Sequence, residues 1–574
     1  MNNRDVALVF GNIADLLEIK GEQVYKVLAY RRAAEALGAL GRDVNAIWQE
    51  GALETIPGVG KAIAAKIDEL LGSGKLEFYE GLVAEVPPGL VDVLKVGGVG
   101  PKKAARFWKE LGVTSLVELE TAAKEGRLRS LPGMGERSES KILENIEALR
   151  RRQTGRISIG EARPVAQALL RQLRELPGVV QAEAAGSLRR WRETVGDVDL
   201  LVAAKEPGEA ARAFARFPGI GRVTGLGETK VSAELVDGMR VQLWVHPPER
   251  FGSALQYATG SQAHNVRLRE LALGRGLSLS EHGFKTKGGK EIPCAEEAEL
   301  YERLGLPWIP PELREDRGEI QAAQEERLPE LVVLEDLVGE LHSHSDWSDG
   351  ESTILQMAQA ARQSGLAYLV ISDHSQSLGV ANGLSLQRLR QQRKALAEAQ
   401  RKLGDSIRLL HGAEVEIRAD GQLDYPDEIL AELDVVTASV HTSLRQKRER
   451  VTARMLSAIR NPNVDVIGHP TGRMIGERDP ADLDMDAVLQ AAADNGVALE
   501  INAHPARLDL NDTHARRAVE LGCRLAINSD AHSPEGFALR EYGVGTARRG
   551  WVTAEAVVNA WPLRRLLQWL RGRG

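Results

Sequence analysis

At 574 residues the chain is too long for one hydrophobic core, so three or more domains are expected. Its 43% hydrophobic and 27% charged residues are typical of globular proteins, and neither a run of eighteen apolar residues nor a signal-peptide core is present, so we expect a cytoplasmic protein that does not enter membranes. The two cysteines are too few and too far apart for a disulfide framework or a thiolate metal site, and the net charge of −7 argues weakly against nucleic acid.

A short glycine-rich turn recurs three times in the first 155 residues. It occurs at 56–61 (IPGVGK), 96–101 (VGGVGP) and 131–135 (LPGMG), and a stretch with helical periodicity follows each copy. A tight turn before a helix directs backbone N–H groups outward at the positive end of the helix dipole, which suits one phosphate. Three copies therefore predict helix-hairpin-helix motifs that hold a nucleic-acid backbone without reading bases, with ordinary helical-hairpin turns as the alternative.

Charge is unevenly distributed over this helical region. Residues 94–156 carry 14 Lys/Arg against 8 Asp/Glu, whereas residues 1–93 carry 9 against 14. The contrast favours one basic docking surface on a mildly acidic chain, although a solvated helical face would explain it equally well. We expect a first helical domain at 1–85 and a second helix-hairpin-helix domain at 86–155.

From about residue 156 the pattern changes to mixed α/β. Alternating apolar runs at 198–202 and 239–245 predict strands, and Asp237-Gly238 predicts a two-residue hairpin turn. A Gly-Ser turn opens the segment GSLRR at 186–190 and lets phosphates approach closely, while Asp197 and Asp199 alternate on one strand face and can share Mg²⁺. The two motifs at this spacing predict nucleotidyl transfer.

These motifs resemble the palm of family X DNA polymerases, and the resemblance spans the first 310 residues. It implies a nucleotidyltransferase palm at 156–246, a nucleotide-binding subdomain at 247–310, Mg²⁺ or Mn²⁺ at the palm, and DNA and dNTPs as substrates. Ser187 and Arg190 would hold the triphosphate, Asn265 would meet the base and Arg269 would contact the template. Further positions that match the family's nucleotide-binding elements are Gly186, Gly196, Tyr257 and Gly260.

The helical region matches the same family. The turns at 58–60 and 98–100 correspond to its two DNA-backbone clamps, with Gly58, Gly60, Gly98 and Gly100 as the implied DNA-binding residues. Tyr30 and Lys66 match a deoxyribose-phosphate-binding tyrosine and a Schiff-base lysine. A solvated helix lysine explains Lys66 at least as well, and the acidic balance of residues 1–93 is a poor match to a strong lyase pocket.

One position departs from the family pattern. The third metal-binding aspartate should lie in MRVQLWVHP, where Arg240 fits but the carboxylate position holds Gln242. A neutral amide supplies neither the anion nor the proton acceptor of that carboxylate. A two-residue turn would place Ala233 opposite Gln242 and turn Glu234 to the other face, so no neighbour substitutes. We therefore expect weak polymerase activity that favours Mn²⁺.

The C-terminal region holds most of the histidines. A charged, proline-bracketed stretch at 311–335 is typical of an inter-domain linker, and beyond it apolar strand-like runs alternate with helical stretches, which predicts a (β/α) barrel at 336–574. Nine N/O ligands fall at or just beyond the predicted strand ends, where barrel loops converge on an active site: His342, His344, Asp349, His374, Glu414, His441, His469, Asp530 and His532. A set without sulfur suits Mn²⁺, Zn²⁺ or Fe²⁺, and clustered divalent ions suit phosphoester hydrolysis.

This ordered set resembles the PHP (polymerase and histidinol phosphatase) family over about 230 residues. The resemblance implies that the nine residues bind up to three metals, in a family that includes nucleases and single-phosphate phosphatases. End to end, the multidomain α+β chain resembles bacterial family X polymerases with a C-terminal PHP domain.

Three functions remain open. The first is a DNA repair enzyme, a gap-filling polymerase joined to a 3′–5′ exonuclease, which acts as a monomer on gapped or nicked duplexes near the nucleoid. The second is a DNA-binding module with little synthesis that presents DNA to the nuclease. The third, a small-molecule phosphatase, leaves the helix-hairpin-helix repeats unexplained.

Overall fold

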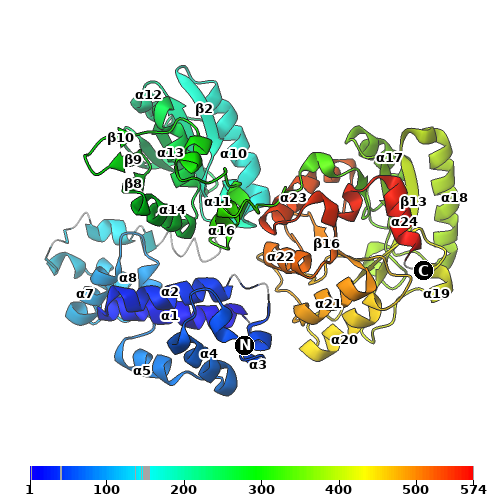
Figure 1. Cartoon of the computed structure of the whole chain (residues 1–574), viewed down its shortest axis with the longest axis horizontal. Helices are drawn as coiled ribbons and strands as arrows, with labels where there is room; N and C mark the ends of the chain where they lie inside the picture. The colour runs from blue at the N-terminus through cyan, green and yellow to red at the C-terminus, as the bar shows by residue number, and fades with distance from the viewer. Residues whose placement is uncertain are drawn as a thin grey trace. The chain divides into compact units, whose positions relative to one another are not determined.

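The structure, a computed structural model (Figure 1), describes residues 1–572 except 2, 39, 41, 133, 136, 137, 144 and 147–155. By its internal contacts the chain divides into two compact units, Met1–Arg156 and Ile157–Gly574. None of the described helices is both long enough and apolar enough to cross a membrane.

The first unit is helical and has one continuous core. Apolar side chains from all its described helices form this core, with Phe10, Ile67 and Phe107 among the fully buried ones. Two of the helices directly follow a glycine turn, since Gly60 precedes α4 and Gly100 precedes α7. The described helices are α1 (Asn3–Lys20), α2 (Val24–Gly38), α3 (Val44–Gln49), α4 (Lys61–Ser73), α5 (Glu77–Glu85), α6 (Leu90–Leu94), α7 (Pro101–Leu111) and α8 (Leu116–Lys124).

The second unit begins with a five-stranded sheet in the order β2-β4-β7-β6-β5, in which β4 and β7 are parallel and the other pairs antiparallel. Alternate apolar residues of β4 and β7 pack beneath α10 and α12, which leaves the polar residues of these strands on the opposite face. The elements are β1 (Ile157–Ser158), α10 (Ile159–Arg174), β2 (Val179–Ala184), α11 (Gly186–Arg189), β3 (Thr194–Val195), β4 (Val198–Ala204), α12 (Pro207–Phe214), β5 (Ile220–Leu226), β6 (Lys230–Leu235) and β7 (Arg240–His246).

The hairpin between β6 and β7 differs from the sequence expectation. Leu235 N donates to Met239 O at 2.8 Å, so the loop has three residues rather than the two of Asp237-Gly238. The register shifts by one: Ser232, not Ala233, lies opposite Gln242. Because side chains alternate along a strand, Glu234 therefore lies on the same face as Gln242, where it pairs with Arg240.

A small α/β subdomain follows the sheet and packs around Leu268, Phe284, Tyr301 and Leu313. The segment 311–335, expected to be a linker, is instead folded into this body: it contains α16 (Glu319–Gln324), and Arg314 and Glu319 are fully buried. Several of its charges pair with residues elsewhere in the fold, Arg314 with Glu297 and Arg317 with Asp512, and this is why a charged composition did not make it a solvated linker. The subdomain consists of α13 (Phe251–Thr259), α14 (Gln262–Gly274), β8 (Leu277–Ser280), β9 (Gly283–Thr286), β10 (Glu291–Ile292) and α15 (Glu297–Arg303).

The C-terminal region is a nearly closed barrel. Its seven parallel strands pair in chain order, and a bridge between Ser343 and Ala531 links the first and last strands. The strands are β11 (Gly339–Glu340), β12 (Tyr368–Ile371), β13 (Arg408–Glu416), β14 (Val435–Ser439), β15 (Val466–Ile467), β16 (Ala498–Asn502) and β17 (Arg524–Asn528). The helices are α17 (Ile354–Gln363), α18 (Leu386–Leu403), α19 (Asp427–Leu430), α20 (Arg448–Ile459), α21 (Met485–Asn495), α22 (Asp512–Glu520), α23 (Arg540–Arg549) and α24 (Leu563–Arg571).

The barrel packs directly against the five-stranded-sheet domain through an apolar contact. Leu508 and Tyr542 of the barrel belong to the same buried cluster as the sheet's own core. Trp191 of the sheet domain meets Tyr542 edge-on, with ring centroids 6.1 Å apart, and lies against Gly545 so closely that a Cβ there would be 2.4 Å from the indole. The two domains therefore share packing rather than a flexible connection.

Candidate functional site

The nine predicted metal ligands converge at the carboxyl ends of the barrel strands. Glu414, on β13, lies at the centre and is fully buried, and four imidazoles surround its carboxylate. The ring nitrogens approach the carboxylate oxygens to 3.3, 2.9, 3.2 and 2.9 Å from His342, His374, His441 and His469 respectively. Burial alone would raise the pKa of Glu414, but the neighbouring imidazoles hold it well below its usual value.

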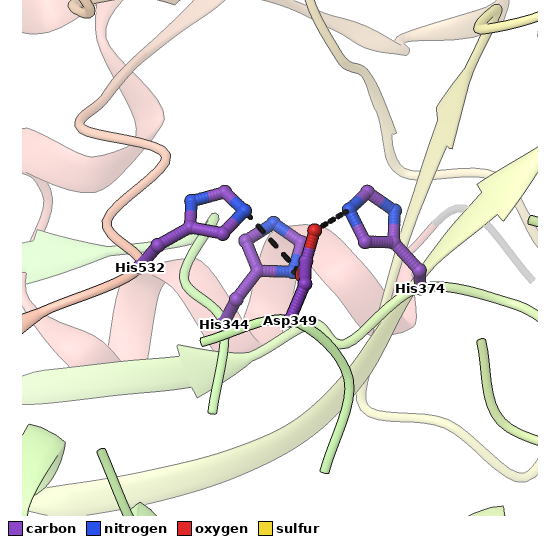
Figure 2. A group of neighbouring side chains, drawn as sticks. All are labelled: His344, Asp349, His374 and His532. Carbon is purple, nitrogen blue, oxygen red and sulfur yellow. Dashed lines mark ion pairs between the residues drawn. The ribbon is translucent and has the colours of Figure 1, made fainter. Parts of the chain in front are cut away.

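The remaining ligands form a second group beside this centre. Figure 2 shows Asp349 between His374 and His532, with His344 adjacent; the carboxylate oxygens of Asp349 lie 3.5 and 3.4 Å from the Nε2 atoms of His374 and His532. His344 Nε2 lies 3.1 Å from Asp530 Oδ1. The side chains come from loops after β11, β12 and β17, so the closure of the barrel brings them together.

The donor set fits divalent cations. Three groups each place their ligand atoms within 4.8 Å of one another: His344, Asp349, His374 and His532; His342, His344 and Asp530; and His374, Glu414 and His441. Among the described residues, both oxygens of Glu414 and one nitrogen each of His342, His344 and His374 are buried without a hydrogen-bond partner. Buried oxygen and nitrogen atoms that point toward one another and lack hydrogen-bond partners are expected where cations bind.

Two further carboxylates orient these ligands and were missed from the sequence. Glu500, on β16, lies 2.7 Å from His342 Nδ1, and Glu416, on β13, lies 2.8 Å from His441 Nδ1. A hydrogen bond at one ring nitrogen fixes the tautomer, so the other nitrogen presents a lone pair. Glu416 could have been found, because it follows Glu414 by two residues and so faces the same side of the strand.

A second site lies in a cleft of about 430 Å³ between the five-stranded sheet and α13–α14. It brings together seven of the eight residues predicted to bind nucleotide, together with Asp199; Gly196 is not among its lining residues. The lining residues are Gly186, Ser187, Arg190, Asp199, Tyr257, Ala258, Gly260, Gln262, Asn265 and Arg269. Gly186 has a positive φ of 59°, and a Cβ there would be 2.0 Å from Asp199 Oδ2, so only glycine fits beside the carboxylate.

Two neighbouring carboxylates suit a cation here: Asp199 lines the cleft, and Asp197 lies near it outside the lining. Burial and the nearby charge of Asp197 raise the pKa of Asp199 to about 7, although the charges of Lys230, Arg190 and Arg240 oppose this shift. Gln242, directly across the parallel pair from Asp199, donates from Nε2 to Asp197 Oδ2 at 2.6 Å. The amide thus occupies a lone pair of Asp197 that a third carboxylate would leave to the metal.

Protein contacts hold several cleft residues in place. Arg190 donates from Nε to Glu315 at 3.1 Å and from Nη1 to the carbonyl of Thr259. Asn265 donates to the carbonyl of Tyr257 and accepts from Gln256, and Arg269 is exposed. Burial and neighbouring arginines lower the pKa of Arg190, although Glu315 opposes this shift.

The glycine turns of the first unit share one geometry. Val59, Val99 and Met134 each donate a backbone N–H to the residue three positions earlier at 3.0 Å. Gly58 and Gly98 have φ of 81° and 80°, and nothing lies within 4 Å of a Cβ built at Gly60 or Gly100. The N-termini of α4 and α7 therefore have room for a phosphate. Gly133, in the third copy, lies outside the described residues.

Tyr30 and Lys66 lie close together around Phe78. The Tyr30 ring stacks on Phe78 at 5.7 Å and is 5% exposed, while Lys66 Nζ lies 5.0 Å from the same ring. Burial raises the pKa of Tyr30 to about 12. The buried ring leaves little surface for a deoxyribose phosphate, and the roles predicted for Tyr30 and Lys66 stay predictions.

Family models match four parts of the chain: a helix-hairpin-helix domain at 1–76, a SAM-like helix-hairpin-helix tandem at 90–148, a DNA polymerase beta thumb at 254–315 and a PHP domain at 340–504. The DNA polymerase/3′-5′ exonuclease PolX of Bacillus subtilis (strain 168) is 39% identical over 567 residues, 98% of each chain. DNA polymerase lambda of Rattus norvegicus is 27% identical over 53% of this chain and 54% of its own. A probable phosphatase of Thermoanaerobacter sp. (strain X514) is 31% identical over 39% of this chain and 90% of its own.

Proposed function

Since the chain belongs to the PolX family, the bacterial family X DNA polymerases with a C-terminal PHP domain, we propose that it fills gaps in duplex DNA at its palm and trims 3′ ends at its PHP centre. The observation that carries the proposal is the cleft that gathers the Gly-Ser turn, Asp199 and the Asn265–Arg269 helix in a body that also holds the histidine cluster. The partners are gapped or nicked DNA and dNTPs, and we expect a monomer associated with the nucleoid.

At the palm, the chain's own residues bind and orient the nucleotide. Ser187 and Arg190 face the cleft and supply a hydroxyl and a guanidinium to phosphate oxygens. Asp197 and Asp199 would hold Mg²⁺ or Mn²⁺, which neutralises phosphate charge and lowers the pKa of the primer hydroxyl. Asn265 is fixed by Gln256 and the Tyr257 carbonyl and thus presents a rigid edge to the base.

In the barrel, the nine ligands would hold a cluster of Mn²⁺, Zn²⁺ or Fe²⁺, which activates water and neutralises the scissile phosphate. Glu414 anchors the centre, and Glu416 and Glu500 keep the tautomers of His441 and His342 fixed. Asp349 is the most exposed of the three ligand carboxylates, with 34% of its side chain accessible, so the cluster is open to a polymer substrate on its side.

We further propose that Gln242 weakens synthesis. Its amide supplies no negative charge and engages Asp197, so the palm metal has one anionic ligand fewer than in the family pattern. The second candidate function, a palm that binds DNA and nucleotide with little synthesis and presents DNA to the nuclease, is favoured by the same observation.

Paired variants of the full-length protein test the proposal. Asp197→Ala with Asp199→Ala should abolish gap filling and leave 3′-end trimming within about twofold, whereas His344→Ala should lower trimming by about a hundredfold or more and spare gap filling. Single-nucleotide gap filling and digestion of a 3′-labelled strand in Mn²⁺ measure the two activities. If wild type shows no synthesis and the double variant only weakens DNA binding, the second candidate replaces the first. Unchanged trimming by His344→Ala would remove the nuclease assignment.

A further inference from the structure

We propose that Arg549, in the last turn of the barrel helix α23, is a positioning residue of the polymerase site: it holds Arg190 against the triphosphate position by bracing both its main chain and its carboxylate partner. The inference rests on the proposed assignment of the cleft to a deoxynucleoside triphosphate. It makes the PHP domain a structural part of the polymerase site.

The contacts join the two domains through one guanidinium. Arg549 Nη1 donates to the carbonyl of Arg190 at 2.7 Å and to Glu315 Oε1 at 2.9 Å, and its Nη2 donates to Asp512 Oδ2 at 2.7 Å. The side chain is 3% exposed, so these bonds form away from competing water. A planar guanidinium makes these bonds from two separated nitrogens, whereas the three donors of a lysine share a single nitrogen.

The carboxylate of Glu315 also binds the side chain of Arg190. Glu315 Oε1 accepts from Arg190 Nε at 3.1 Å, and the Thr259 carbonyl accepts from Arg190 Nη1. Neither bond uses Nη2, which remains as a donor for a phosphate oxygen. Arg190 lines the cleft, so fixing its Nε and Nη1 also fixes the direction in which its remaining donor points.

Charge explains why Arg549 is needed as well as Glu315. Alone, Glu315 would neutralise Arg190 and compete with the triphosphate for it. Arg549 shares the same oxygen, and although burial alone would raise the pKa of Glu315, Arg549 and Arg190 lower it to about 2, so the carboxylate is balanced by more than one cation. Asp512 in turn pairs with Arg549 and with Arg317 at 2.8 Å. Arg549 thus helps to balance the negative charge of Glu315, so the positive charge of Arg190 stays available to the triphosphate.

The packing of α23 fixes this geometry. Gly545, one turn before Arg549, lies against Trp191, the residue that directly follows Arg190. Arg163 stacks on the same indole, with its guanidinium carbon 4.0 Å from the ring centre, and pairs with Glu541 at 3.3 Å. These contacts fix α23 against the turn that contains Arg190 and Trp191, so Arg549 is held at a constant distance from Arg190.

Nucleotide affinity tests the proposal on the full-length protein. The probe is a fluorescent dATP analogue titrated in Mn²⁺, and four variants are compared with wild type: Arg190→Met, Arg549→Met, Arg549→Lys and Arg548→Met. Arg190→Met should weaken binding by about tenfold, the effect of one lost charge-assisted contact. Arg549→Met and Arg549→Lys should each weaken it by about threefold or more, because methionine donates no hydrogen bond and the single nitrogen of lysine does not replace both guanidinium nitrogens.

Arg548→Met is the matched control, because it removes the neighbouring arginine of α23, whose bonds in the described structure go to Glu312 and the Val332 carbonyl rather than to Arg190 or Glu315. It should change affinity by less than about twofold. In a double-mutant cycle, Arg549→Met should cause no further loss of affinity in the Arg190→Met background, because Arg549 acts through the guanidinium of Arg190. A general loosening of the palm would instead cause a further loss. Trimming of 3′ ends by Arg549→Met should stay within about twofold, which shows an intact barrel.

The results that overturn the inference are distinct from those that overturn the proposed function. Wild-type affinity in Arg549→Met, equal losses in Arg548→Met and Arg549→Met, or additive losses in the cycle would refute the positioning role while the nucleotide site stands. If Arg549→Met does not fold, Arg549→Lys alone decides by the same criteria. Failure of wild type to bind the analogue, or binding by Arg190→Met as tight as wild type, would remove the nucleotide site and the inference with it.

Discussion

Replacing Gln242 with aspartate should restore the missing negative charge of the palm. Gln242 lies directly across the parallel pair from Asp199, and its amide is 2.6 Å from Asp197 Oδ2, so a carboxylate at this position would be within reach of a cation held by the two aspartates. At about 4 Å and an effective dielectric constant of about 20, the added attraction is about 4 kcal/mol per unit of cation charge. Desolvation of the new carboxylate and its repulsion from Asp197 and Asp199 offset most of this gain.

If about 1.4 to 2.8 kcal/mol of that attraction remains in the transition state, gap filling accelerates about tenfold to a hundredfold. The assay is single-nucleotide gap filling by the full-length protein in Mg²⁺ and in Mn²⁺, and the gain should be larger in Mg²⁺. The metal-free variant should melt at a lower temperature than wild type, because Asp199, with its pKa already raised to about 7, gains a second like charge nearby.

Ser232→Asp is the charge-matched control. Ser232 faces Gln242 from the neighbouring strand, so the variant adds the same charge one strand further from the aspartates. It should accelerate gap filling by less than about threefold, because the attraction falls with distance and solvation. Equal rates for wild type and Gln242→Asp would refute the reasoning, and equal gains in both variants would show that only net charge matters.

Two further variants test the packing and charge around Arg190. The pKa of Glu315 is about 2 in the folded protein against an ordinary 4.5, so ionised Glu315 contributes about 3 kcal/mol to stability above pH 4.5, and this is lost as the pH falls toward 2. Glu315→Gln should therefore unfold more easily in urea at pH 7 and converge with wild type near pH 2; an equal difference at both values would contradict the assignment. Gly545→Ala would place a Cβ 2.4 Å from Trp191 and should cost about 1 to 3 kcal/mol, whereas Gly274→Ala, with open space around it, should leave the melting temperature nearly unchanged. An unshifted melting temperature for Gly545→Ala would show that the interface is not packed as described.

The convergence of the nine candidate ligands was the most predictable part of the molecule. Each ligand lies at or near the end of an apolar run, and a barrel of parallel strands brings such ends together whatever the loops do. The hairpin at Asp237-Gly238 was less predictable, because the same dipeptide fits loops of two and three residues and one extra residue inverts every side chain of β6. This is why Glu234 was placed on the wrong face.

The charged segment at 311–335 could not be interpreted from composition. Buried and solvated ion pairs look alike in a sequence, and only the fold shows that Arg314 is enclosed with Glu297 at 2.6 Å while Glu315 meets Arg549 from 234 residues further along. Such contacts depend on the packing of whole domains, and no local periodicity signals them. The Arg190–Glu315–Arg549 network was accordingly absent from the sequence prediction.

The folded segment 311–335 also decides how the chain can be divided. A fragment that ends at residue 310 would retain every residue expected to bind nucleotide, yet it would lose Glu315, Arg314 and the barrel surface that covers Trp191. Its buried Glu297 would keep Arg189 as a partner but lose Arg314. Activities measured on such a polymerase fragment would describe a damaged enzyme. A PHP domain exchanged between relatives should support the polymerase site only when the segment 311–335 and α23 come from the same protein.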